Sequence, residues 1–96
     1  MKRQGDLLII EIKNLPQGSR RKKDHVLAEG EVSGHLHVLD GGHVYEDHQT
    51  LFFEVPSDAQ VTLTHPEHQP LIFNPGTYKV VRQREYQPAG WRYVSD

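Results

Sequence analysis

Four histidines stand in two closely spaced pairs, and an imidazole can ligate a metal ion, exchange a proton or contact a small ligand. His35 and His37 are separated by one residue in GEVSGHLH, and His65 and His68 are separated by two in HPEH. Residues two apart in a strand point to the same face, which would place the Cα atoms of the first pair roughly 6.6–7 Å apart. Two imidazoles at this spacing can converge on one metal ion.

The second pair can complete a ligand set. In QVTLTH, Leu63 and His65 share a face, so His65 points inward at the end of its strand if Leu63 does. His68 follows a short turn and is the fourth candidate ligand, and Glu67 in that turn could supply a carboxylate or orient an imidazole. Glu31 has the strand parity of the first pair and is a second candidate for orienting a ring through its other nitrogen.

The composition restricts the chemistry of such a site. The chain has seven histidines and no cysteine, which excludes disulfides, thiolate ligands and cysteine nucleophiles. Zinc, iron, manganese, nickel and copper all accept nitrogen and oxygen ligands, so a divalent transition metal is the expected cofactor, or else a small ligand binds there. We do not expect an enzyme, although a metal with an open position would permit metal-dependent hydrolysis. A purely structural role for the histidines stays open as the alternative.

A second candidate surface follows from TYKVVRQREY near the C-terminus. Arg82, Arg84 and Tyr86 fall on one face of that strand, and Trp91 and Arg92 come soon after. Arginines between aromatic rings can stack on bases and contact phosphates, so a nucleic-acid or protein partner is the alternative function. The same arginines can instead lie over a sheet face and form ion pairs. The net charge of -2 argues against a general nucleic-acid binder.

The elements that would position these residues are strands. No stretch has helical periodicity, and short apolar or alternating runs are separated by turn residues. We therefore predict an all-β fold, a small barrel or curled sandwich of about seven short, mostly antiparallel strands. The expected strands are 6–12, 25–39 as one bent strand or two, 50–55, 60–65, 70–73 and 77–86.

The length of 96 residues fits a single domain over 1–96, with 17–24 as a flexible basic loop and 90–96 as a loose tail. No apolar run is long enough to cross a bilayer, and the N-terminal segment does not read as a signal peptide. We expect a cytoplasmic protein without a membrane partner. Self-association through the edge of the final strand is a third possibility, and it would require no chemistry.

Two resemblances add to this interpretation. GEVSGHLH resembles the first cupin motif, in which a glycine precedes a metal-binding HxH pair inside a barrel. The sequence departs from that pattern, because Asp40, Gly41 and Gly42 stand where the motif's glutamate belongs and no histidine follows Pro75-Gly76. The blocks RQGDLLII, LAEGEVSGHLH and HPEHQPLIFNPGTYKVVRQREY resemble a family of small uncharacterised bacterial and phage-associated proteins. This resemblance implies one compact β domain, and for the alternative function it implies a phage or mobile-element setting.

Overall fold

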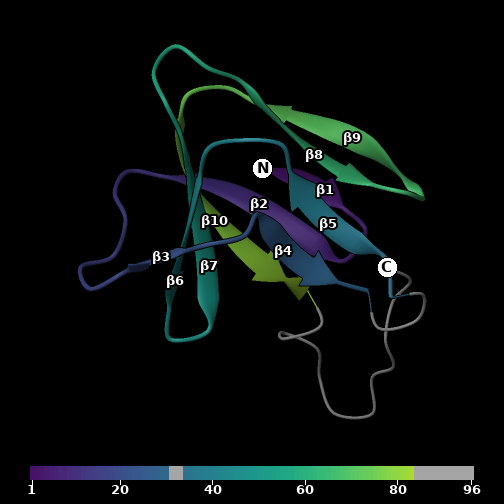
Figure 1. Ribbon diagram of the computed structural model, residues 1–96, viewed down its shortest axis with the longest axis horizontal. Coiled ribbons are helices and arrows are strands. Elements are labelled where there is room, and N and C mark those ends of the chain that lie inside the picture. Colours follow the sequence, from purple (N-terminus) through teal and green to yellow (C-terminus); the bar gives the residue numbers. More distant parts are fainter. Residues whose placement is uncertain (31–33, 84–96) are drawn as a thin grey trace.

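The computed structural model describes residues 1–30 and 34–83, which form ten strands in two antiparallel sheets (Figure 1). The six-stranded sheet has the order β1-β2-β10-β7-β6-β3, and the four-stranded sheet has the order β4-β5-β8-β9. The strands are β1 (Lys2–Gln4), β2 (Leu7–Ile12), β3 (Arg20–Lys22), β4 (Val26–Glu29), β5 (Leu36–Leu39), β6 (His43–Asp47), β7 (Thr50–Val55), β8 (Val61–His65), β9 (His68–Phe73) and β10 (Gly76–Arg82).

The all-β prediction is confirmed, and of the two predicted architectures the described strands form the sandwich. Pairing ends at β1 and β3 in one sheet and at β4 and β9 in the other, so the described strands do not close into a barrel. The resemblance of GEVSGHLH to the first cupin motif therefore does not extend to a closed barrel among the described strands. The described ranges also contain no helix long and apolar enough to span a membrane.

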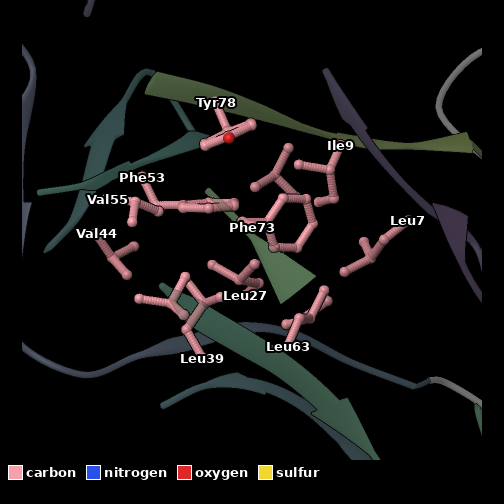
Figure 2. Close-up of a cluster of buried hydrophobic side chains, with 13 residues drawn as sticks. Leu7, Ile9, Leu27, Leu39, Val44, Phe53, Val55, Leu63, Phe73 and Tyr78 are labelled. Atoms are coloured by element: carbon pink, nitrogen blue, oxygen red, sulfur yellow. The ribbon is translucent and has the colours of Figure 1, made fainter. Parts of the chain in front are cut away.

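The core lies between the two sheets, where alternate residues of facing strands meet (Figure 2). Phe53, Phe73 and Tyr78 form its aromatic centre, with ring centroids 4.9–5.2 Å apart. These separations lie in the range at which aromatic pairs attract beyond simple burial. The Tyr78 hydroxyl donates a 2.7 Å hydrogen bond to the Asn74 carbonyl, so the buried ring keeps a partner for its polar atom.

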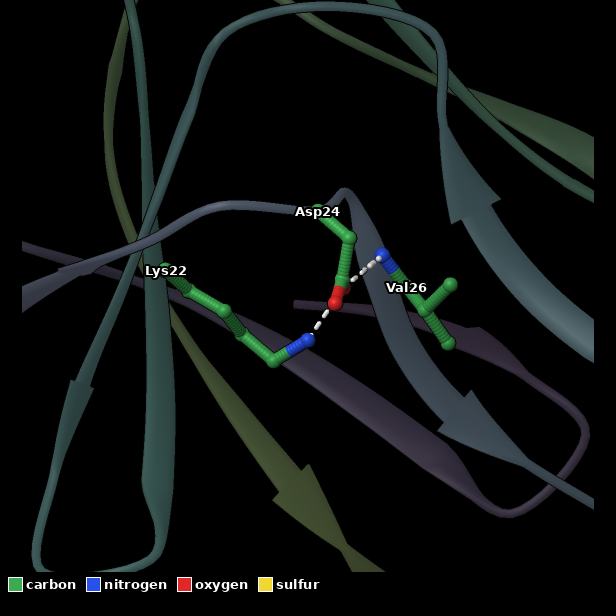
Figure 3. A network of polar contacts seen from close by, with 3 residues as sticks. All are labelled: Lys22, Asp24 and Val26. Atoms are coloured by element: carbon green, nitrogen blue, oxygen red, sulfur yellow. Dashed lines mark hydrogen bonds and ion pairs between the residues drawn. The ribbon is translucent and has the colours of Figure 1, made fainter.

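One turn carries the chain from the edge of the larger sheet to the edge of the smaller one (Figure 3). The Asp24 carboxylate accepts a hydrogen bond from the Val26 backbone N–H at 3.0 Å and pairs with the Lys22 ammonium. The hydrogen bond from Lys22, followed by the one from Val26, lowers the pKa of Asp24. Asp24 thereby joins the end of β3 to the start of β4.

The β6–β7 hairpin turns through two residues that both have positive φ, His48 at 48° and Gln49 at 70°. They connect the paired residues Asp47 and Thr50. Positive φ at both central positions is the backbone form that matches the twist of a two-residue hairpin. Asparagine and glycine adopt it most readily, so His48 and Gln49 occupy the turn at some conformational expense.

Several predicted boundaries differ from the structure. Segment 25–39 contains two strands, β4 and β5, which pair antiparallel as the Gly30 N–H donates to the His35 carbonyl at 2.8 Å. Segment 17–24 is not simply a flexible loop, because it contains β3, whose short run of basic residues pairs with β6. The N-terminal strand β1 was not predicted from the sequence. The predicted tail 90–96 lies outside the described residues.

Candidate functional site

The two histidine pairs come together at one end of the four-stranded sheet. His37 lies on β5, His65 ends β8, His68 begins β9, and His35 immediately precedes β5. The His65 ring is central, with centroids 4.4 Å from His37, 4.5 Å from His68 and 5.6 Å from His35. His37 and His68 are 6.2 Å apart. We call these four residues the histidine cluster.

The strand pattern explains why two of these rings face the interior. Along β8, Val61, Leu63 and His65 alternate onto the core face and are 2%, 0% and 6% exposed. The inward orientation predicted for His65 is therefore confirmed. His37 is 0% exposed, whereas its neighbour Leu36 points outward and is 41% exposed. The apolar core thus continues into imidazole rings where β5, β8 and β9 meet.

A glutamine from the other sheet contacts this cluster. Gln4, on β1, is only 2% exposed, and its Nε2 donates 2.9 Å hydrogen bonds to the carbonyls of Leu63 and Gln69. Its Oε1 lies 2.9 Å from His37 Nδ1. Because both amide hydrogens are directed to carbonyls, Oε1 must accept, and His37 Nδ1 must carry the proton. This network assigns the neutral His37 ring a lone pair on Nε2.

That lone pair has no hydrogen-bond partner among the described residues, although His37 Nε2 is buried. Burial is the main cause that lowers the pKa of His37 from 6.5 to about 4. The neighbouring His65, His68 and Arg82 lower it further, and Asp6 opposes them. His37 is consequently a neutral imidazole at neutral pH, with an electron pair available to a cation or a hydrogen-bond donor.

His65 is held in the opposite tautomer. The Glu67 backbone N–H donates to His65 Nδ1 at 3.1 Å, so the proton of the neutral ring lies on Nε2. The Glu67 side chain reaches a different ring, with Oε1 3.4 Å from His35 Nδ1. A carboxylate at this nitrogen favours the Nδ1–H form of His35, an arrangement common behind metal-ligating histidines.

The cluster borders a shallow surface hollow of about 580 Å³. His35, Thr64 and His65 are its polar lining residues, and Leu36, Val38 and Pro66 are apolar ones. Two rings of the cluster, those of His35 and His65, therefore border the protein surface. A small ligand or a hydrated ion could reach the rings from this side.

The arrangement is not a preformed metal centre. Within 1–30 and 34–83, no three histidine or carboxylate side chains are disposed as ligands of one metal ion. Two imidazoles that share a tetrahedral zinc have ring centroids on the order of 5 Å apart, given Zn–N bonds of about 2.0–2.1 Å. The cluster rings approach this spacing, but because no three described side chains are disposed as ligands, a shared metal ion would require some rings to turn.

The structure thus brings together all four histidines expected from the sequence and places Glu67 beside His35. It does not describe Glu31, or the expected partner-binding residues Arg84, Tyr86, Trp91 and Arg92. Arg82 is described, and its Nη2 lies 3.3 Å from both the Asp6 carboxylate and the Glu29 carbonyl.

Sequence reasoning missed Gln4. The only available signal was a polar residue in a short N-terminal segment, and its contacts lie 33 to 65 residues away along the chain. Local patterns cannot reveal such contacts.

One protein family matches the chain. The model of a domain of unknown function, DUF8820, covers residues 3–83, and the chain belongs to this family. The match spans β2 to β10 and includes all four cluster histidines. No curated protein and no solved structure matches the chain. The family description supports the expected membership of an uncharacterised family and names no ligand or activity.

Proposed function

We propose that this protein binds a divalent transition-metal ion at the histidine cluster. The observation that carries the proposal is the meeting of four imidazoles from neighbouring strands of one sheet, with contacting ring centroids 4.4–6.2 Å apart. Imidazole nitrogen suits zinc, copper, nickel and iron, and a chain without cysteine has no thiolate to compete.

The energetics of burial support a ligand at this place. An acceptor that is buried without a partner costs about 1–3 kcal/mol, because the water it would bind in the unfolded chain is not replaced. His37 Nε2 is such an atom. A metal bond to this lone pair would remove the penalty, so the same feature that destabilises the free protein would favour the bound one.

The histidines would differ in how readily they ligate. His37 presents its lone pair without rearrangement of its own hydrogen bond, so it is the first ligand in the proposal. His65 would have to give up the hydrogen bond from the Glu67 N–H, since ligation through Nε2 places a proton on Nδ1. His35 and His68 sit at the side of the buried pair and would complete the ligand set by turning toward the ion.

The test uses protein purified without a histidine tag, and measures zinc and nickel binding by isothermal titration calorimetry. The double variant His35→Ala/His37→Ala removes two cluster histidines. The control His43→Ala/His48→Asn removes two histidines from the β6–β7 hairpin, and asparagine tolerates the positive φ at position 48. Circular dichroism establishes that each variant is folded.

We expect binding of one metal ion per chain in the unaltered protein and in the control, with loss of that binding in the cluster variant. An unaltered protein that binds neither metal would refute the proposal. Equal losses in the two double variants would also refute it, since they would mean that scattered surface histidines hold the ion.

The expected partner surface is not proposed as a second function. Arg82, its described member, is engaged by Asp6 and Glu29, and this contact fits a structural role. The cytoplasmic setting and the bacterial or phage origin stay predictions from the sequence.

A further inference from the structure

Gln4 occupies an unusual position for a polar side chain, because it belongs to one sheet and satisfies polar groups of the other. Its strand β1 is the edge of the six-stranded sheet and lies beside β9, the edge of the four-stranded sheet. The Lys2 ammonium donates to the Ile72 carbonyl at 2.6 Å, and this bond joins β1 to β9 at a position two residues before Gln4. These contacts hold the Gln4 side chain between the two sheets.

The three hydrogen bonds of the Gln4 amide have two separable consequences. The bonds from Nε2 to the carbonyls of Leu63 and Gln69 join β1 to β8 and β9. The bond accepted by Oε1 concerns His37 alone and determines which ring nitrogen carries the proton. A donor at the position of Oε1 would reverse the tautomer and direct an N–H, instead of a lone pair, into the cluster.

We infer that Gln4 is a positioning residue that presents the Nε2 lone pair of His37, and so adapts the cluster to a cation and not to an anion. The inference rests on the proposed metal-binding function and names the residue that sets its ligand class. Groups that orient a metal-ligating histidine through its other nitrogen typically change metal affinity by about 10- to 100-fold when removed.

Two substitutions separate positioning from simple structural support. Gln4→Met is close in size and removes both donors and the acceptor. Gln4→Glu also removes the two donors to Leu63 and Gln69 but keeps an oxygen that can accept from His37 Nδ1. Both variants lose the same bonds between the sheets, so only the contact with His37 distinguishes them.

Zinc affinity of the full chain is measured by calorimetry for both variants and the unaltered protein. We expect Gln4→Met to bind zinc about 10- to 100-fold more weakly, and Gln4→Glu to retain affinity close to that of the unaltered protein. Equal affinities in the two variants, whether both high or both low, would overturn the inference, because loss of the acceptor would then have no effect of its own.

A second measurement needs neither a variant nor a metal. Long-range ¹H–¹⁵N correlation spectra of the unaltered, metal-free protein at neutral pH report which nitrogen of His37 is protonated. We expect Nδ1 to carry the proton, and a proton on Nε2 would overturn the inference. If the unaltered protein binds no zinc, the proposed function fails, while this spectrum still decides whether Gln4 sets the tautomer.

Discussion

Acidification should destabilise the metal-free protein because His37 is buried as a neutral imidazole. The pKa of His37 is about 4 in the folded protein, against 6.5 for an unperturbed ring. Between these two values the unfolded chain binds a proton that the folded protein does not, so stability falls as the pH falls. The contribution of His37 is complete above about pH 6.5 and decreases below it. From pH 7 to pH 5 the loss in free energy of unfolding is about 2 kcal/mol, and by pH 4 it is about 3 kcal/mol.

Urea unfolding followed by circular dichroism measures this loss, with a chelator present at pH 7, 6 and 5. The comparison is His37→Gln, which does not titrate and can still donate to Gln4 Oε1. The other six histidines titrate in both proteins, so the informative quantity is the difference in stability between them. We expect that difference to change by about 2 kcal/mol in favour of the variant between pH 7 and pH 5. A difference that stays constant with pH would refute the burial argument, and so would an NMR titration of the unaltered protein that places the pKa of His37 near 6.5.

Two further predictions concern the scaffold. His48→Asn should raise the free energy of unfolding by about 0.5–1 kcal/mol, because asparagine tolerates the positive φ at this turn better than histidine; an unchanged or lower urea midpoint would argue against a strained turn. Leu63→Ala should lower it by about 2–5 kcal/mol, since Leu63 is fully buried beside the cluster. The matched control is the apolar truncation Ile72→Ala, at a side chain that is 51% exposed, and it should change the free energy of unfolding by no more than about 0.5 kcal/mol. Similar losses of stability in the two variants would contradict the assigned core.

The strands that can be predicted are those with a local apolar or alternating pattern. The run 50–55 was predicted from its apolar and β-branched residues and corresponds to β7. The inward orientation of His65 followed from its parity with Leu63, because side chains two apart in a strand share a face. The division into two sheets could not be predicted in the same way, since the order β1-β2-β10-β7-β6-β3 depends on pairings between distant segments.

In the candidate site, too, local spacing predicted some features, whereas others depend on contacts between distant segments. Spacing placed His35 with His37 and His65 with His68, and the meeting of the two pairs required only that β5 and β8 be neighbours. The tautomers did not follow from spacing. They depend on Gln4 reaching across from the other sheet and on the Glu67 N–H at the β8–β9 turn.

The histidine cluster stands where a continued apolar core would give a more stable protein. Val61, Leu63 and His65 follow one another on the same face of β8, and an apolar side chain at position 65 would be the third in that row, without any unmet hydrogen bond. The chain instead buries His37 with an acceptor that no described residue satisfies, and uses a glutamine with three hydrogen bonds to hold it. Natural sequences depart from local rules of stability mainly at functional sites. A glutamine that served packing alone would need its two bonds to carbonyls, but it would not need to leave a buried imidazole lone pair beside the rings of His65 and His68. The proposed metal binding would account for this lone pair, because a bond to a cation would satisfy an acceptor that folding leaves buried without a partner.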